Sequence, residues 1–283
     1  MFGFLNVYKP KGKTSHDVVG ILRRITGEKQ IGHTGTLDPF AEGVLPICIG
    51  KATRLIEYLK DDKAYIGTVQ LGKSTTTYDI EGESVNISDK IVDIEEIEQV
   101  LQSFRGEITQ LPPIYSAIKV KGKKLYEYAR KGEEVKIEPR EVNISKLEII
   151  NYDKEQKQLE LYIACSKGTY IRSIANDLGE KLGTYGHLIK LIRVKAGDFG
   201  VNEAVKLENL QTKEDVGEHL IYPIEYLDYP KYELSESEKN LVSNGMPISA
   251  KIDDGLVILT YNKSLIAVAE AFESKLSCRK VFV

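Results

Sequence analysis

One stretch of twelve residues, from Gly32 to Gly43, limits what this chain can fold into. It contains three glycines and a proline, which excludes both a regular helix and a central strand. Asp38 comes directly before Pro39, and a residue in that position is pushed toward extended backbone. The sequence therefore predicts a stiff loop that presents a short carboxylate at Asp38.

The segment after this loop helps to decide between an ordinary surface turn and a functional loop. Asp-Pro pairs are common in surface turns, and an isolated pair is usually interpreted in that way. Here residues 43–50 form the apolar run Gly-Val-Leu-Pro-Ile-Cys-Ile-Gly, which predicts a buried strand. Polar loops anchored to core strands often carry binding and catalytic residues. Asp38 is therefore our first candidate for a functional residue.

The stretch GHTGTLDPFAEGVLPICIGKATR resembles the signature of the TruB-type tRNA pseudouridine synthases of the bacterial stand-alone kind. That family isomerises uridine-55 in the T loop of tRNA to pseudouridine, and the resemblance makes Asp38 the catalytic aspartate. It also implies the pseudouridine synthase fold, an α+β fold in which helices flank a central mixed, mainly antiparallel β-sheet. The resemblance extends over nearly the whole chain.

The composition is that of a globular protein, with 42% hydrophobic and 29% charged residues. No apolar run reaches the roughly 18 to 20 residues that span a bilayer. The first lysines follow the apolar residues of the amino terminus, which is the reverse of a signal peptide. The three cysteines and four histidines show no metal-binding spacing. We therefore expect a cytoplasmic protein with no membrane contact and no structural metal.

A second motif, at residues 67–74, satisfies the literal P-loop pattern as GTVQLGKS. A working P-loop needs a flexible loop that leads into a helix. Residues 64–71 instead alternate as a strand, with Tyr65, Val69 and Leu71 on one face. We interpret the motif as part of a strand and expect no nucleotide cofactor. The family resemblance makes Tyr65 a candidate for stacking on uracil and taking the C5 proton, and a core-facing strand tyrosine is the alternative.

Charge is distributed unevenly along a chain whose net charge is −3. Residues 119–131 hold six Lys or Arg against one acid, whereas residues 79–102 hold eight acids against one base. This pattern suits a polyanion that docks in one orientation, and solvated helix faces would produce it as well. Lysines interleaved with tyrosines suit RNA, because ammonium groups meet phosphates and flat rings stack on bases.

The basic segment also resembles the RNA-binding thumb insert of the family, at about residues 110–140. The alternative is a hairpin and a short helix whose tyrosines belong to the core. On the first interpretation the segment supplies a set of substrate-binding residues: Tyr115, Lys119, Lys121, Lys123 and Lys124.

The sequence Gly-Thr-Tyr-Ile-Arg at residues 168–172 opens a predicted helix that ends at Gly183. Arg172 falls in the first turn, where the helix dipole disfavours a cation. A carboxylate or phosphate beside it would explain the charge. In the family the arginine of this motif pairs with the catalytic aspartate, which makes Arg172 a third catalytic residue. A neighbouring guanidinium lowers the pKa of a carboxyl group and would keep Asp38 ionised.

Four further residues complete the predicted substrate-binding set. Lys9 precedes the loop as it does in the family, although Lys-Pro-Lys-Gly is also an ordinary strand-to-helix turn. His33 is the natural insert for the gap that an extruded uridine leaves, or it makes a loop hydrogen bond. Thr36 lies within the loop. Arg193 stands where the family often carries a double arginine, so one phosphate contact is in question.

Two more helices and a carboxyl-terminal unit are predicted from patterning. Thr14 and Ser15 offer a cap for a helix that Gly27 stops, and residues 93–104 form an amphipathic helix with Ile94, Ile97, Val100 and Leu101 on one side. From about Pro230 a short helix and short alternating strands follow. Residues 229–283 resemble a PUA-type β-barrel, packed on a catalytic domain of residues 1–228.

Isomerising uridine breaks the N1–C1′ bond and forms a C5–C1′ bond, which requires an ionised carboxylate but neither a metal nor a nucleotide cofactor. Whether that carboxylate attacks the sugar or the base, or acts through a glycal, stays open. The expected partner is the T arm of tRNA, with no obligate protein partner and a monomeric enzyme. Alternatives are an RNA-binding module without catalysis, a guided enzyme of the dyskerin class, and a P-loop NTPase. Asp38, Tyr65 and Arg172 argue against the first, and the thumb-like segment argues against the second.

Overall fold

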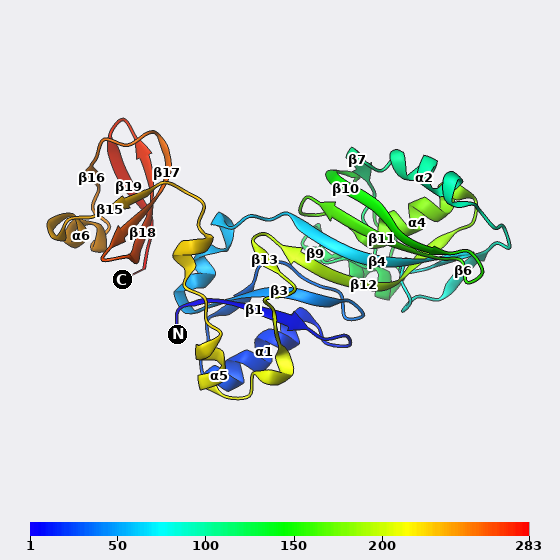
Figure 1. Cartoon of the computed structure of the whole chain (residues 1–283), viewed down its shortest axis with the longest axis horizontal. Coiled ribbons are helices and arrows are strands. Elements are labelled where there is room, and N and C mark those ends of the chain that lie inside the picture. Colours follow the sequence, from blue (N-terminus) through cyan, green and yellow to red (C-terminus); the bar gives the residue numbers. More distant parts are fainter. Residues whose placement is uncertain (283) are drawn as a thin grey trace.

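Figure 1 shows a computed structural model of the chain, which describes residues 1–282. A large mixed sheet extends through most of the molecule, and a smaller sheet built from residues 231–281 lies at one end of its long axis, at the left in Figure 1. None of the helices in the described residues is long and apolar enough to cross a lipid bilayer.

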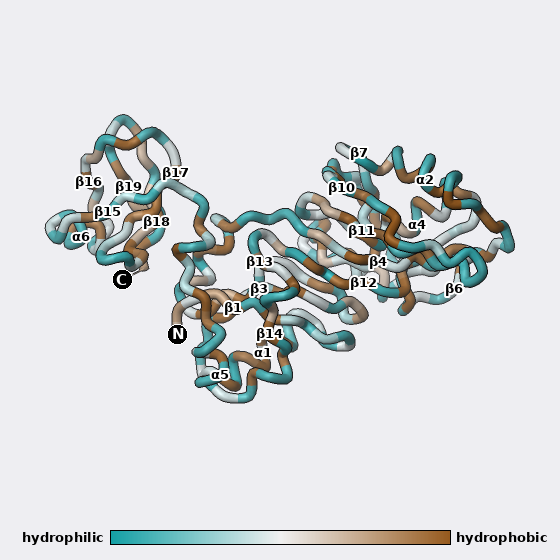
Figure 2. The backbone as a smooth tube through the Cα atoms, in the orientation of Figure 1, coloured by the Kyte–Doolittle hydropathy of each residue, from teal (hydrophilic) through white to brown (hydrophobic). Residues whose placement is uncertain are grey.

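The large sheet has the strand order β14-β1-β3-β12-β4-β11-β10-β7, with β13 paired to β12 and β2 paired to β3. Only the β1–β14 and β3–β12 pairs are parallel, so the predicted mixed, mainly antiparallel sheet is confirmed. Hydrophobic residues occur along β4, β11 and β12, and the connecting loops are mostly hydrophilic (Figure 2). The strands are β1 (Gly3–Lys9), β2 (Ile31–His33), β3 (Glu42–Ile49), β4 (Lys63–Leu71), β7 (Gly106–Gln110), β10 (Arg140–Asp153), β11 (Gln158–Cys165), β12 (Gly186–Ala196), β13 (Phe199–Gly200) and β14 (Val205–Lys206).

Helices cover this sheet in two groups, each over its own buried cluster. The apolar stripes of α4 and α2 pack on β4, β10, β11 and β12. α1 and α5 pack on β1 and β3. The helices of this part are α1 (Ser15–Thr26), η1 (Gly50–Tyr58, a 3-10 helix), α2 (Ile94–Gln102), α3 (Leu125–Lys131), α4 (Ile171–Leu182), η2 (Leu207–Asn209), α5 (Lys213–Glu218) and η3 (Pro223–Tyr226).

The predicted helix ends are confirmed at α1 and α4. Thr14 caps α1 by accepting a hydrogen bond from the backbone of Asp17, whose side chain bonds back to Thr14. Gly27 and Gly183 end the two helices in the left-handed conformation. In α2 one expectation is wrong, because Ile94 is 45% exposed whereas Ile97 and Leu101 are fully buried. Ile94 is the first residue of the helix, and the core contacts come from the later turns.

The P-loop pattern is a false match, as predicted. β4 continues to Leu71, Gly72 takes a φ of +99°, and the chain enters β5 (Lys73–Thr75) and β6 (Ser84–Ile87) without a helix.

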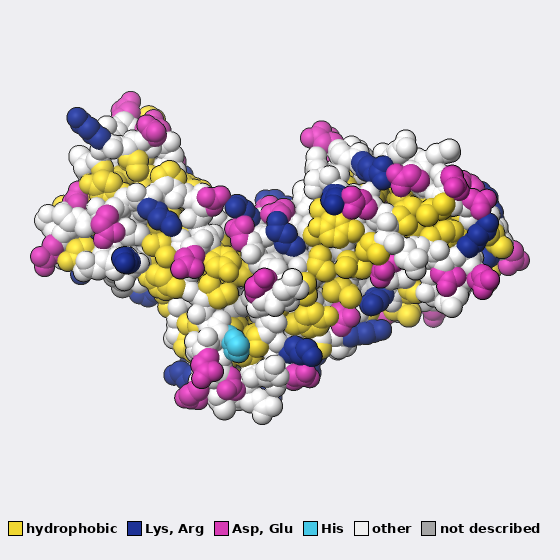
Figure 3. Space-filling model, in the orientation of Figure 1, with side chains coloured by type: hydrophobic (Ala, Val, Ile, Leu, Met, Phe, Trp, Pro, Cys, Tyr) yellow, Lys and Arg dark blue, Asp and Glu magenta, His cyan; other side chains and the backbone are white. Residues whose placement is uncertain are grey.

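The small sheet has the order β15-β17-β18-β19-β16 and carries one helix, α6 (Glu236–Ser243), which Ser235 caps. Its apolar residues share a cluster with β1, β3 and η1, and Lys280 pairs with Glu57 at 3.1 Å. The expected packing on the larger part is therefore confirmed. On the face in Figure 3 the surface is hollowed between the small sheet and the β7–β10 end of the large sheet, and basic and acidic side chains are interspersed on it. The strands are β15 (Lys231–Glu233), β16 (Ile248–Ser249), β17 (Gly255–Tyr261), β18 (Ser264–Phe272) and β19 (Lys275–Val281). Val283, to which the predicted carboxyl-terminal unit extends, lies outside the described residues.

A close contact between α4 and β12 sets the position of the helix that carries Arg172. A Cβ atom added to Gly179 of α4 would lie 2.1 Å from the backbone nitrogen of Gly186. This contact involves two backbones and no flexible side chain that can move away. The two glycines therefore let the helix approach the sheet more closely than any other residue pair would allow.

We expect Gly179→Ala to lower the free energy of unfolding by about 2 kcal/mol or more, because the methyl group overpacks a backbone contact. The matched control is Gly20→Ala in α1, where an added Cβ meets no atom within 4 Å. That change should instead stabilise by about 0.5 to 1 kcal/mol, because alanine favours a helix. Urea unfolding of both variants tests this, and equal effects would contradict it.

Candidate active site

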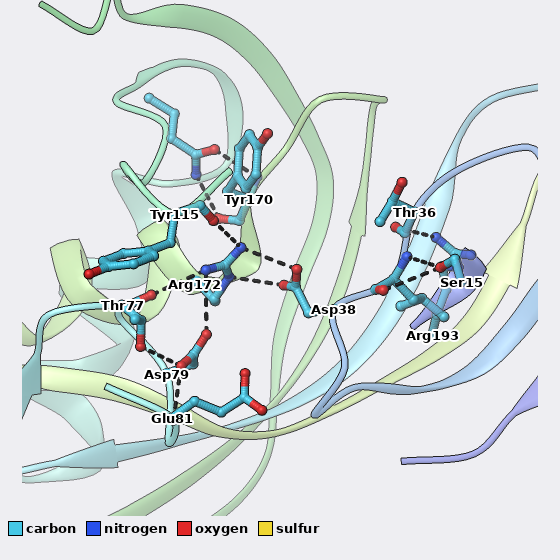
Figure 4. Close-up of polar contacts among 12 residues, drawn as sticks. Ser15, Thr36, Asp38, Thr77, Asp79, Glu81, Tyr115, Tyr170, Arg172 and Arg193 are labelled. Atoms are coloured by element: carbon cyan, nitrogen blue, oxygen red, sulfur yellow. Dashed lines mark hydrogen bonds and ion pairs between the residues drawn. The ribbon is translucent and has the colours of Figure 1, made fainter. Parts of the chain in front are cut away.

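The loop from residue 32 to residue 43 is fixed to the core at both ends. β2 pairs with β3, and the backbone nitrogen of Thr34 donates to the carbonyl of Pro46 at 3.1 Å. Leu37 is 3% exposed, and its backbone exchanges two hydrogen bonds with the Ser15 hydroxyl. Asp38 follows and points away from the loop toward α4 (Figure 4). The predicted stiff mount is confirmed, and Ser15 is a support that sequence reasoning assigned only to a helix cap.

Two predicted substrate-binding residues, Lys9 and Arg193, lie beneath the loop and are fully buried. The Arg193 guanidinium donates to the carbonyls of Val44, Gly35 and Thr36 at 2.7, 3.0 and 3.3 Å. Lys9 Nζ donates to the carbonyls of Lys13, Pro10 and Pro39 at 2.6, 3.0 and 3.4 Å.

Burial lowers the pKa of Lys9 to about 8, against the attraction of Asp38. In this conformation neither cation reaches the surface where a phosphate would lie. The sequence patterns at Lys9 and Arg193 identify their importance but not their orientation, because a buried cation and a surface cation look alike in a motif.

Arg172 joins two carboxylates at the amino-terminal end of α4. Its Nε lies 2.9 Å from Asp38 Oδ2, its Nη2 lies 3.2 Å from Asp38 Oδ1, and its Nη1 lies 3.4 Å from Asp79 Oδ2. The predicted pairing of Asp38 with Arg172 is confirmed. Asp79 is assigned no role at the site in the sequence analysis, although it stands in the Thr-rich run that follows the strand of Tyr65 and resembles the family there.

The surroundings hold the guanidinium in one orientation. Its remaining donors meet the backbone carbonyls of Tyr115 at 3.1 Å and Thr77 at 3.3 Å. Asp79 is itself 3% exposed and accepts from the Thr77 hydroxyl and the backbone of Glu81. Two carboxylates thus offset the unfavourable interaction between Arg172 and the helix dipole.

The charge state of Asp38 results from opposing effects. Burial raises the pKa of Asp38, and Arg172 and Lys9 act in the opposite direction while Asp79 adds to the increase. The expected lowering by the guanidinium is therefore present, but burial outweighs it. A third of the Asp38 side chain remains exposed, and this part faces a cavity.

The cavity beside Asp38 has a volume of about 800 Å³ and is large enough for a ligand of nucleotide size. Tyr65, 7% exposed, forms part of its wall, and burial raises the pKa of its hydroxyl. Of the predicted site residues, the cavity brings together Thr36, Asp38, Tyr65, Tyr115, Lys124 and Arg172.

His33 lies next to this cavity and not in its lining. Its ring packs edge-on against His16, with centroids 5.7 Å apart, and its buried Nδ1 has no hydrogen-bond partner in the described structure. Burial, His16 and Arg193 lower the pKa of His33 to about 4, so the ring is neutral near neutral pH.

The segment at 110–140 forms a small hairpin, β8 (Lys119–Val120) and β9 (Lys123–Lys124), which leads into α3. Lys119, Lys121 and Lys123 are exposed on it. The hairpin and helix are those of the alternative that sequence reasoning left open, but Tyr126 and Tyr128 are only partly buried and stack against cations, with Leu125 as the buried residue.

Within residues 1–282, no group of three or more His, Cys, Asp or Glu side chains is placed to hold a metal ion.

Comparisons with known proteins agree with this geometry. Residues 23–171 match the TruB family pseudouridylate synthase (N terminal domain), and residues 172–227 match the tRNA pseudouridylate synthase B C-terminal domain. The tRNA pseudouridine synthase B of Caldanaerobacter subterraneus subsp. tengcongensis is 44% identical over 286 residues, which cover 99% of each chain. That of Geobacillus thermodenitrificans is 44% identical over 274 residues, covering 92% of this chain and 91% of the relative.

Solved structures with the same fold include an H/ACA RNP bound to a substrate RNA containing 2′-deoxyuridine, with a TM-score of 0.70 and 25% identity over 100% of this chain and 85% of that one. A Cbf5-Nop10-Gar1 complex gives a TM-score of 0.69 at 26% identity, with the same coverage. Fold and sequence thus define an RNA pseudouridine synthase, an enzyme that isomerises uridine. The chain belongs to the TruB family of pseudouridylate synthases.

We expect Arg172→Met to lower the free energy of unfolding at neutral pH by about 3 kcal/mol or more, because it leaves the buried Asp79 without its cation. Adding Asp79→Asn should recover most of that loss, since the carboxylate that then still lacks its cation, Asp38, is a third exposed and lies near Lys9. Urea unfolding measures both effects. A double variant no more stable than Arg172→Met would contradict the ion-pair interpretation.

Proposed function

We propose that this enzyme converts uridine-55 in the T loop of tRNA to pseudouridine, with Asp38 as the catalytic carboxylate. The observation that carries the proposal is the pairing of Asp38 with Arg172 at the wall of a nucleotide-sized cavity. The names of the curated relatives, tRNA pseudouridine synthase B, support tRNA as the substrate.

The reaction breaks N1–C1′, rotates the base and forms C5–C1′, and the proton lost from C5 is balanced by the one gained at N1. Asp38 acts on the nucleoside as the ionised carboxylate, by attack on the sugar or the base or by assisting formation of a glycal. Arg172 stabilises that ionised form and aligns both oxygens. We assign Tyr65 to stacking on the uracil and to removal of the C5 proton. As a neutral phenol it accepts that proton only while passing on its own.

The target uridine must leave its stack to reach Asp38, which costs a few kcal/mol. We assign His33 to the gap that the uridine leaves. A neutral imidazole suits this role, because inserting it into stacked bases removes no charge from water. His33 lies on the same loop as Asp38, so insertion and presentation of the carboxylate belong to one rigid element.

RNA contacts are assigned to Thr36 and Tyr115 at the cavity and to Lys119, Lys121, Lys123 and Lys124 on the hairpin, which acts as the thumb of about residues 110–140. For Lys9 and Arg193 we replace phosphate contact with a positioning role, because both donate to backbone carbonyls under the loop. Residues 1–228 then form the catalytic domain.

Residues 229–283 form a PUA-like RNA-binding domain in this proposal, supported by the small five-stranded sheet. We place the enzyme in the cytoplasm as a monomer without an obligate protein partner. The second candidate is a guided enzyme, because the solved neighbours with this fold belong to ribonucleoproteins. The thumb-like hairpin favours independent action.

We expect purified protein without ATP or added metal to convert one T-loop uridine in an unmodified tRNA transcript. Asp38→Asn should abolish turnover while tRNA affinity stays within a few-fold, since the change removes one charge and keeps the shape. Asp62→Asn, at an exposed aspartate, is the control. Mass detection of pseudouridine in nuclease fragments locates the product. Normal turnover by Asp38→Asn would refute the catalytic assignment, and a product elsewhere would refute the assigned site.

The pH dependence should report Asp38. Because burial raises its pKa, the activity that needs the ionised form is present above the raised pKa and is lost as the pH falls through it. The acid limb should therefore lie above the ordinary aspartate value of about 4. Arg172→Gln removes the opposing charge and should move the limb to higher pH, whereas Lys195→Gln should not. Single-turnover rates against pH measure this, and a limb that moves to lower pH would contradict it.

A further inference from the structure

Three lysines line the active-site cavity: Lys63, Lys124 and Lys167. The other cations near Asp38 are engaged elsewhere, since Arg172 is paired with carboxylates and Lys9 and Arg193 are bonded to backbone carbonyls. A nucleotide that enters base-first toward Asp38 leaves its two phosphates at the rim. Any cation that meets those phosphates must therefore come from the rim lysines.

Lys63 differs from the other two in its position. It is the first residue of β4, two residues before Tyr65, so both side chains project from the same face of the strand. Its side chain also lies against the catalytic loop, because a Cβ added to Gly35 would be 3.3 Å from Lys63 Cε and 3.9 Å from its Nζ. The ammonium therefore lies between Tyr65, which we assign to stacking on the base, and the loop that carries Asp38.

The Lys63 ammonium has no carboxylate within ion-pair distance among residues 1–282, and its hydrogen bond goes to the carbonyl of Asp61 at 2.9 Å. The nearby acids are already paired, Asp61 with Lys167 at 2.7 Å and Asp62 with Lys195 at 3.1 Å. Burial and the Arg193 guanidinium lower the pKa of Lys63, while Asp61 and Asp62 oppose them. The site therefore disfavours the charged form of Lys63 when no anion is bound. A bound phosphate would supply the negative charge that the site lacks.

We propose that Lys63 binds a phosphate that flanks the target uridine once that nucleotide occupies the cavity, and thereby positions the ribose C1′ against Asp38. This assignment rests on the proposed function. Lys167, exposed and paired with Asp61, stands beside it as a secondary contact. Lys63 is a positioning residue, because its ammonium holds the sugar-phosphate backbone and does not touch the reacting bonds.

The test pairs variants of the full-length enzyme with altered RNA. The enzymes are wild type, Lys63→Met, Lys63→Arg and the control Lys190→Met, which removes an exposed lysine of β12 outside the cavity. The substrates are T-arm stem-loops in which the phosphate on the 5′ or the 3′ side of the target uridine is a neutral methylphosphonate. The measurement is the single-turnover rate and the RNA affinity, with thermal unfolding as a check on folding.

We expect Lys63→Met to lower the rate constant divided by the dissociation constant by about tenfold to a hundredfold, the size of a charge-assisted hydrogen bond. Lys63→Arg should restore part of the loss, and Lys190→Met should change this ratio less than threefold. For wild type, one of the two methylphosphonates should cause a loss similar to that of Lys63→Met. Combining that substrate with Lys63→Met should add little, because the same contact is removed twice.

The proposal is overturned if Lys63→Met does not lower the rate constant divided by the dissociation constant, or if neither methylphosphonate lowers it for wild type. It is also overturned if the loss from Lys63→Met and the loss from the methylphosphonate multiply when the two are combined. The comparison of the altered RNAs with the wild-type enzyme stays informative even if a Lys63 variant folds poorly, because it changes only the substrate. Failure of wild type to convert any T-loop uridine would overturn the proposed function together with this assignment. Normal conversion with no effect at Lys63 overturns this assignment alone.

Discussion

The arrangement of the site depends on one guanidinium held between two carboxylates. Arg172 contacts Asp38 and Asp79 and fills its other donors with backbone carbonyls, so it has little freedom to turn. Asp38 comes from the loop before β3, Asp79 from the turn after β5, and Arg172 from α4. Three segments that are distant in sequence thus meet at one side chain. Their meeting depends in turn on how closely α4 approaches β12, where two glycines bring the backbones together.

Electrostatics divides the cations of the site into two kinds. Lys9 and Arg193 are fully buried and donate to carbonyls of the loop that carries Asp38, so they fix its shape. Lys63, Lys124 and Lys167 line the cavity. The first kind stabilises the loop without any ligand. Within the second kind, Lys167 is paired with Asp61, whereas Lys63 has no carboxylate within ion-pair distance among residues 1–282. A substrate that carries phosphates at its rim and a neutral base at its tip fits this division.

The sequence predicted much of the fold because its signals are local. Caps at Thr14 and Gly183, the alternation from residue 64 to 71 and the rigid loop at Asp38 all depend on neighbouring residues. The pairing of Asp38 with Arg172 came from the family resemblance and from the cost of a cation in a first helical turn. The direction of Lys9 and Arg193 and the part played by Asp79 were not predictable in this way. These depend on which elements lie above and below a side chain, which is decided by tertiary packing.

The contact between Arg172 and the carbonyl of Tyr115 connects the segment that precedes the hairpin to Asp38. On the proposed function, an RNA contact that moved the Tyr115 carbonyl would change this hydrogen bond, and with it the interaction of Arg172 with Asp38. By thermodynamic linkage such an effect would be reciprocal, so the protonation state of Asp38 would change the affinity for RNA by the same free energy. RNA binding around Tyr115 and proton binding at Asp38 would therefore be thermodynamically coupled.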